Sequence, residues 1–241
     1  MARISSRARI SLLGSLVLGS VVSCLAPTLA LGAAIGTFNI DGTFTLSGTS
    51  PQTISWMADT SPFPANKAQI GATGLTGSFA GLGGTQVTIQ DVTNPPAVTG
   101  GTGFPAQLFL SFDAAPALGT LSLSFVAPGV DPSASCGLAP ATGQLCALPG
   151  SPFDFQNTPG GGSRMGFVFA GVSNPNGSTW MGTFTSQFGI TYQQVFATLA
   201  GGLSVTSTYS ATFSVVPEPA SVTLLLGGLG ILAAASRRRA P

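Results

Sequence analysis

Apolar and polar residues alternate strictly along the segment from residue 36 to residue 48. Its even positions hold the apolar residues Phe38, Ile40, Phe44 and Leu46, and its odd positions are polar. Successive side chains of a strand point to opposite faces, so the pattern predicts a half-buried strand. Asp41-Gly42 is a dipeptide typical of hairpin turns. Because the alternation continues through it without a shift, we predict one long strand that is kinked at Gly42.

The segment from residue 203 to residue 215 repeats this alternation on odd positions. Its apolar residues are Leu203, Val205, Tyr209, Ala211, Phe213 and Val215. Shorter apolar runs lie between the two segments, at residues 53–56, 85–92, 106–112, 120–126, 165–172 and 179–188. Stretches rich in Gly and Pro separate these runs. About eight strands at this spacing predict an all-β body, an antiparallel β-sandwich or jelly roll.

One segment has a helical period instead. Tyr192, Val195, Phe196 and Leu199 recur at helical spacing. Thr191 and Gln194 form a capping-box pattern, and Gly201 is a typical helix stop. We therefore predict one short helix at residues 192–200 that covers an open end of the sandwich.

The beginning of the chain has the layout of a secretory signal peptide. Arg3, Arg7 and Arg9 precede an apolar run from residue 10 to residue 22, and small residues follow. The run is about 13 residues long, which is short for a membrane span. We predict a signal peptide of residues 1–30, removed by signal peptidase after export through the Sec machinery. Cleavage at Gly32 or Ala34 is an alternative.

A second reading of the beginning involves Cys24. The sequence Val-Val-Ser-Cys at residues 21–24 resembles a lipoprotein box. Processing there would leave a lipid on Cys24. A lipid anchor would duplicate the anchor that the other end of the chain provides.

The end of the chain has the features of a membrane span. Residues 220–236 carry no charge, and as a helix they would extend about 26 Å, close to the ~30 Å hydrocarbon core of a bilayer. Pro217 and Pro219 keep the preceding segment extended. Arg237, Arg238 and Arg239 follow as a cytoplasmic stop, which places the body outside. We predict a transmembrane helix; an ordinary tail anchor is the simpler alternative.

Pro217, Glu218 and Pro219, followed by this apolar span and the arginine cluster, resemble the PEP-CTERM sorting signal of Gram-negative bacteria. The resemblance covers about the last 25 residues, in motif, order and position. It implies cleavage near Pro-Glu-Pro by an exosortase and a link to exopolysaccharide or biofilm production. The same tail is also described as an ice-binding protein C-terminal domain, which names the tail and not an activity. The predicted division is therefore a signal peptide at 1–30, a β-sandwich body at 31–216 and a sorting signal at 217–241.

The charges of the body exclude one class of partner. Residues 31–216 contain six Asp against Lys67 and Arg164, a net charge of −4. Such a body cannot neutralise a phosphate backbone, so we expect no nucleic-acid partner. Only 6% of all residues are charged, which suits an exported β protein better than a cytosolic enzyme.

Catalytic chemistry has few candidates in this sequence. The chain contains no histidine, which removes imidazole from catalysis and from metal binding. The remaining acids of the body are Asp41, Asp59, Asp91, Asp113, Asp131 and Asp154, with no local motif. Two of them could meet as a hydrolase pair, but each more readily caps a turn or faces water at a strand end. We predict no enzyme, no cofactor and no metal site.

Cys136 and Cys146 are the two cysteines that remain after removal of a signal peptide. Two cysteines in an exported chain predict a disulfide, with two free thiols as the alternative. A metal site would lack further ligands.

Two surface features admit binding functions. Trp56 and Trp180 could stack on sugars, as in glycan-binding modules, but each shares strand parity with core residues, so burial is favoured. The threonine pairs Thr43/Thr45, Thr183/Thr185 and Thr206/Thr208 could face ice, although Thr is also a common strand residue. Our leading prediction is an exported, non-enzymatic surface or matrix protein. A glycan-binding module is the alternative; an ice-binding protein and an Asp-dependent hydrolase are remote ones.

Overall fold

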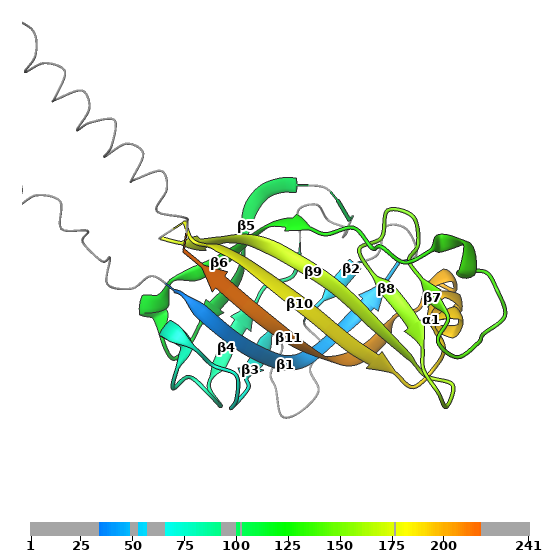
Figure 1. Cartoon of the computed structure of the whole chain (residues 1–241), viewed down its shortest axis with the longest axis horizontal. Coiled ribbons are helices and arrows are strands. Elements are labelled where there is room, and N and C mark those ends of the chain that lie inside the picture. The colour runs from blue at the N-terminus through cyan, green and yellow to red at the C-terminus, as the bar shows by residue number, and fades with distance from the viewer. Residues whose placement is uncertain are drawn as a thin grey trace, which may run out of the picture. The chain divides into compact units, whose positions relative to one another are not determined.

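The computed structural model describes residues 34–48, 53–56, 66–92, 100–101, 103–175 and 177–217. Outside these residues lie the predicted signal peptide with Cys24, and the end of the chain from Glu218 onward. That end includes Pro219, the apolar stretch at residues 220–236 and Arg237, Arg238 and Arg239. The described chain is mostly β with one short α-helix, as predicted (Figure 1).

Within the described residues, the strands follow one another with three short 3-10 helices and one α-helix between them. The strands are β1 (Gly36–Ser47), β2 (Thr53–Ser55), β3 (Lys67–Ile70), β4 (Gln86–Ile89), β5 (Gly103–Phe112), β6 (Thr120–Val126), β7 (Leu145–Cys146), β8 (Asp154–Asn157), β9 (Ser163–Asn174), β10 (Thr179–Phe188) and β11 (Val205–Val216). The helices are η2 (Gly77–Phe79), η3 (Pro116–Leu118), η4 (Ser133–Ser135) and α1 (Tyr192–Ala200).

Eight of the strands close into an antiparallel barrel, so the expected two-sheet sandwich or jelly roll is wrong. The ladders run β1–β3–β4–β5–β6–β9–β10–β11 and return from β11 to β1. The closing element is β9. One of its edges pairs with β10 along the whole strand, and the other pairs first with β8 and then with β6. Because β9 pairs with β10 on one edge and with β6 on the other, it closes the sheet into a barrel.

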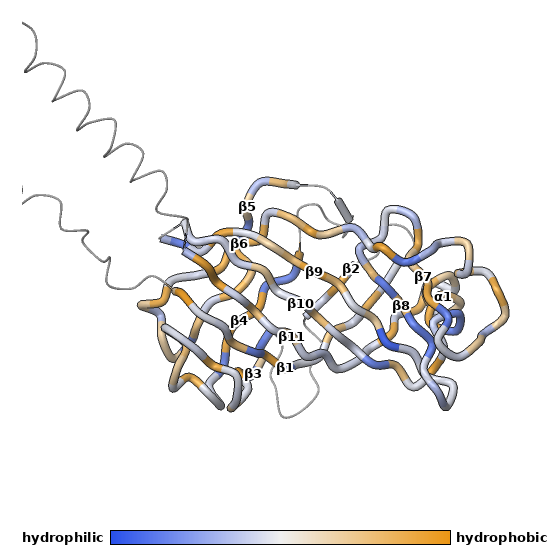
Figure 2. The backbone as a smooth tube through the Cα atoms, in the orientation of Figure 1, coloured by the Kyte–Doolittle hydropathy of each residue, from blue (hydrophilic) through white to orange (hydrophobic). Residues whose placement is uncertain are grey.

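The barrel interior is filled by the side chains that the alternation assigned to it. In β1 and β11 the buried apolar residues are Phe38, Ile40, Phe44, Leu46, Tyr209, Ala211, Phe213 and Val215. The changing hydropathy along these strands is visible in Figure 2. Phe184 of β10 lies near the middle of the core, with its ring stacked on Phe167 at 4.7 Å and in edge contact with Phe213 at 5.5 Å. Leu203, predicted to continue the inner row, precedes β11 and is 65% exposed.

Three strands of the structure were not predicted from the sequence. They are β3, β7 and β8, which are two to four residues long. Segments this short do not contain enough residues to show a period, and β8 reads Asp-Phe-Gln-Asn. Each pairs with a longer strand, β3 with β1, β7 with β8 and β8 with β9, and β3 also pairs with β4, which has the same length.

The helix lies where it was predicted. Thr191 and Gln194 form the capping box, and Gly201 is the C-terminal cap. Tyr192, Val195 and Leu199 are buried, and the ring of Phe196 makes an edge contact with Phe155 of β8 at 5.0 Å. Figure 1 shows α1 beside β7 and β8, at one end of the barrel.

The two ends of the barrel therefore differ. At the first, which we call the tail end, β1 begins and β11 finishes, with Gly36 opposite Val215. At the second, which we call the helix end, β1 finishes, β11 begins and α1 packs against β8. The described chain enters and leaves the barrel at the tail end.

Candidate functional site

A cleft of about 490 Å³, lined by polar and apolar side chains, opens at the helix end of the barrel, over β8, β9 and β10. Arg164 of β9 lies between two amides in the ladders, opposite Gln156 of β8 and opposite Gln187 of β10. One row further along, Asp154 and Thr185 both face Gly166. Because Gly166 has no side chain, this row leaves an open space between Asp154 and Thr185. We call this hollow the helix-end cleft.

Two carboxylates border the helix-end cleft. The Asp154 side chain accepts hydrogen bonds from the backbone N–H groups of Val130 and Asp131, at 2.7 and 2.9 Å. It thereby holds the loop that carries Asp131 against β8. Burial raises the pKa of Asp131 above its ordinary value, the negative charge of Asp154 raises it further, and the Arg164 guanidinium opposes both effects.

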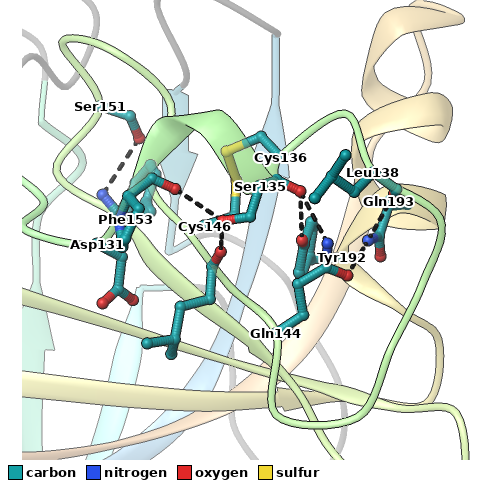
Figure 3. Close-up of a disulfide and its surroundings, with 12 residues drawn as sticks. Asp131, Ser135, Cys136, Leu138, Gln144, Cys146, Ser151, Phe153, Tyr192 and Gln193 are labelled. Atoms are coloured by element: carbon teal, nitrogen blue, oxygen red, sulfur yellow. Dashed lines mark hydrogen bonds between the residues drawn. A yellow bond between two sulfur atoms is a disulfide. The ribbon is translucent and has the colours of Figure 1, made fainter.

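The predicted disulfide between Cys136 and Cys146 is present, with Cα atoms 5.0 Å apart (Figure 3). It closes the loop that follows Asp131 and joins it to β7. The Tyr192 hydroxyl donates to the carbonyl of Ser135 at 3.0 Å, and the Gln193 amide donates to the Gln144 side chain at 2.9 Å. Helix α1, the disulfide loop and the wall of the helix-end cleft are therefore one connected structure.

Several groups of the cleft are available to a ligand. Within the described parts of the chain, the Arg164 guanidinium forms no ion pair, and Lys67 with Asp113 is the ion pair found, at 2.7 Å. The side chains of Arg164, Thr185 and Gln187 are exposed, and Asp131 is half-buried. Guanidinium and amide N–H groups beside carboxylate and amide oxygens offer donors and acceptors together, which is a combination suited to polyhydroxylated ligands.

Two of the other predicted acids, Asp91 and Asp113, have structural partners. The Asp91 carboxylate accepts a hydrogen bond from the backbone N–H of Trp56 at 2.7 Å. The Asp113 carboxylate accepts hydrogen bonds from the Lys67 ammonium and the Thr88 hydroxyl. Asp41 is exposed on β1, and Asp59 lies outside the described residues. Among the described acids, Asp131 and Asp154 are the two that the fold brings into one cleft. The position of Arg164 in this cleft was not predicted, because nothing in its local sequence shows that β8 and β10 flank it.

Among the residues that the structure describes, the tryptophans and tyrosines do not form a sugar-stacking surface. Trp56 and Trp180 are 1% and 2% exposed, as their strand parity predicted. Tyr192 and Tyr209, which could have shared a groove with them, are also buried. The Trp180 indole N–H donates to the carbonyl of Ser122 at 3.0 Å inside the barrel wall.

The threonine pairs lie on neighbouring strands but do not form one continuous array. Thr43 faces Thr208 and Thr45 faces Thr206 across β1 and β11. Thr43 is nearly buried, at 9% exposure, and the hydroxyls of Thr45 and Thr206 are hydrogen-bonded to each other at 3.0 Å. On β10, Thr183 and Thr185 face Thr212 and Ser210 instead.

The proposed sorting signal begins where the barrel ends. Val215 is buried and lies opposite Trp180 of β10, Val216 is the last residue of β11, and Pro217 follows at the surface. No linker separates the barrel from the Pro-Glu-Pro sequence. Within the ranges that the structure covers, no helix has both the length and the apolar character needed to cross a membrane.

Comparison with known proteins identifies this end of the chain. The family described as the PEP-CTERM protein-sorting motif matches residues 215–239, a range that includes Pro217, Glu218, Pro219 and the three late arginines. No curated protein and no solved structure matches the chain. The chain thus carries a PEP-CTERM protein-sorting motif, the signal of an exported protein that passes through the membrane and is processed by an exosortase.

Proposed function

We propose that the chain is a non-enzymatic surface or extracellular-matrix protein that acts in the exopolysaccharide matrix of a biofilm. The observation that carries the proposal is the direct junction between a disulfide-linked barrel and the sorting motif. The motif begins at Val215, inside the last barrel strand. The barrel is therefore the cargo that the sorting signal delivers.

The composition of the cargo supports a role outside the cell. A disulfide persists in an oxidising compartment and stabilises a small exported domain. The absence of histidine from the sequence and the structural engagement of Asp91 and Asp113 support a non-catalytic body. Low charge and many hydroxyl groups on the outer faces of β10 and β11 suit contact with hydrated polysaccharide.

The proposed sequence of events uses both ends of the chain. The Sec machinery exports the precursor, and signal peptidase removes residues 1–30. The tail then holds the body on the outer side of the inner membrane, with Arg237, Arg238 and Arg239 on the cytoplasmic side. Exosortase cleaves near Pro-Glu-Pro, and the barrel reaches the cell surface or the medium.

The direct test replaces Pro217, Glu218 and Pro219 by Ala in a host that has an exosortase. Residues 220–236 and the arginines are unchanged, so membrane insertion should persist and uncleaved precursor should accumulate in the inner membrane. Mass spectrometry of both chain ends, in envelope and medium, measures this. The matched control changes two exposed prolines of the body, Pro140 and Pro149, to Ala and should mature like the parent.

Two further results complete the test. Replacement of Arg237, Arg238 and Arg239 by Ser should act differently, because it removes the cytoplasmic stop and lets the tail insert poorly or slip through. If the Pro-Glu-Pro variant matures and leaves the membrane as the parent does, the sorting role is wrong and the tail is a plain anchor.

A second candidate function, glycan binding, is favoured by the helix-end cleft and not by the tryptophans. Gln156, Arg164 and Gln187 form one polar row, and this row lies at the opposite end of the barrel from the sorting motif. A body held by its tail would present the cleft away from the membrane. Affinity electrophoresis of the mature protein in gels containing the host exopolysaccharide tests this. Arg164→Gln should lose retardation, and the exposed β11 variant Thr208→Ala should keep it.

A further inference from the structure

An apolar patch covers the outer side of the barrel at the tail end. It consists of Phe125, Val172, Met181 and Val216, which we call the tail-side patch. Phe125, Met181 and Val216 are 38%, 54% and 53% exposed, and Val172 is half-buried. Large apolar side chains gathered at one place on a monomer's surface mark an interaction site more often than single ones do.

The ladder registers show that these four residues are neighbours. Phe125 of β6 and Met181 of β10 both lie opposite Ala170 of β9 and so flank it. One row closer to the tail, Val172 and Val216 both lie opposite Thr179. The residues line one shallow hollow of about 630 Å³, and all of its lining residues are uncharged. The helix-end cleft, by contrast, is lined by Arg164, Asp131 and Asp154.

The chain that follows the patch determines what can reach it. Val216 is the last residue of β11, and residues 217–219 alone separate it from the uncharged stretch at 220–236. An extended chain spans at most ~3.6 Å per residue, so these three residues bridge about 11 Å. While residues 220–236 are in the bilayer, Val216 is therefore held within about 11 Å of the membrane surface.

We propose that the tail-side patch rests on the phospholipid surface while the precursor is held in the membrane. This inference rests on the proposed function, because it needs the tail in the bilayer. Met, Phe and Val side chains can enter the boundary between headgroups and acyl chains, a layer about 5–10 Å deep for interfacial segments. Uncharged surroundings are needed there, since each charged group would have to be desolvated.

The contact has a consequence for processing. A barrel resting on its tail-side patch keeps Pro217 and the residues after it at the membrane surface, where a membrane-embedded protease reads its substrate. Four apolar side chains provide a weak and reversible contact, comparable to a single marginal anchor and not to a membrane span. Cleavage of the tail therefore releases the barrel, because the patch alone does not hold it.

The experiment places a fluorescent probe on the full-length chain in vesicles. Cys24→Ser removes the cysteine that is not part of the disulfide between Cys136 and Cys146. Met181→Cys then carries an environment-sensitive NBD label. Gln187→Cys is the matched control, because it is exposed on the same strand, six residues or about 20 Å toward the helix end. The vesicles contain phosphatidylethanolamine, phosphatidylglycerol and spin-labelled phosphatidylcholine. Quenching at position 181 should exceed that at position 187 several-fold.

A pair of substitutions separates apolar contact from simple tether length. In the chain labelled at position 181, Phe125→Gln and Val216→Gln together should abolish most of the quenching, because the tether is unchanged and the patch is polar. If quenching persists at its original value, the tether alone explains it and the inference is wrong.

A third probe distinguishes failure of this inference from failure of the sorting function. With the label at Leu226→Cys, strong lipid quenching reports an inserted tail. Absent quenching at both 226 and 181 overturns the membrane-held precursor and the patch contact together. Quenching at 226 without quenching at 181 overturns the patch contact alone. Protection of position 181 from aqueous iodide without lipid quenching also overturns it, since a second copy of the chain then covers the patch.

Discussion

Gly42 lies directly opposite Tyr209 in the ladder between β1 and β11, and the Tyr209 ring occupies the space beside the glycine. A Cβ atom at residue 42 would be 2.9 Å from both Cε1 and the hydroxyl oxygen of Tyr209. The ring is buried and makes an edge contact with Trp56 at 4.8 Å. Gly42 therefore serves to admit an aromatic ring in the middle of a continuous strand, and the Asp41-Gly42 hairpin is excluded.

The first prediction follows from this contact. Gly42→Ala should lower the free energy of unfolding by about 1–3 kcal/mol, because the new methyl group overpacks against Tyr209. Urea unfolding followed by circular dichroism measures the loss. The control is Gly189→Ala, where an added Cβ has no atom within 4 Å. Equal unfolding midpoints for the two variants would show that the Tyr209 ring moves away without cost.

The second prediction concerns the Tyr209 hydroxyl. This oxygen is buried and has no hydrogen-bond partner among the described residues. Removing an unsatisfied buried polar atom costs no hydrogen bond, so Tyr209→Phe should leave stability at neutral pH unchanged or slightly higher.

The same substitution should change the response to alkali. Burial raises the pKa of Tyr209 in the folded barrel, and the negative charge of Asp41 adds to the effect. The unfolded chain loses this proton near pH 10, while the folded chain keeps it, so the parent is destabilised as the pH rises above about 10. The difference in urea midpoint between parent and Tyr209→Phe should therefore widen above that pH in favour of the variant. Parallel pH profiles would contradict it.

Local patterns predicted the local structure well. The parity of Phe38 and Phe213 placed both in the core, and their rings stack at 4.7 Å. The helix from Tyr192 to Ala200 was predicted to the residue, because a capping box and a helical period are both short-range signals.

What the sequence could not supply is pairing between distant segments. Closure of the barrel depends on β9 meeting β6 on one edge at Phe169–Asn174 and β10 on the other edge at Ser163–Val172, and alternation carries no information about partners. The helix-end cleft also results from pairing between distant segments. In the sequence Arg164 is a single polar residue of a strand, and only the pairing of β9 with β8 and β10 places Gln156 and Gln187 on its two sides.

The third prediction concerns the disulfide. Replacing Cys136 and Cys146 together by Ser should lower the free energy of unfolding by about 2.5–3 kcal/mol, from the chain entropy of the open loop. Urea unfolding of the exported protein with and without dithiothreitol measures the same quantity in the parent. The double variant is its own control, because the reductant should leave it unchanged. Complete thiol labelling of both cysteines in unreduced protein would contradict the bond.

The last prediction uses Asp131 as a reporter of the helix-end cleft. Its pKa is raised in the folded chain, first by burial and then by the negative charge of Asp154. Above the raised pKa the carboxylate is charged in both states, and the folded state carries the cost of holding that charge. As the pH falls through the raised pKa toward the unfolded value of 3.8, the folded chain takes up the proton first. Acidification through this window therefore stabilises the parent.

Asp131→Asn replaces the titrating carboxyl by an amide. The variant should therefore lose the part of the pH dependence of the unfolding free energy that comes from Asp131. The unfolding free energy of the parent minus that of Asp131→Asn should rise as the pH falls from neutrality and become constant below about pH 3.8. Urea is the suitable denaturant, because a charged denaturant would screen Asp154. In the Arg164→Gln background the rise should be larger, since the guanidinium opposes the shift. A difference that falls on acidification would mean that Arg164 outweighs both burial and Asp154, and that Asp131 is held in the cleft as one half of an ion pair.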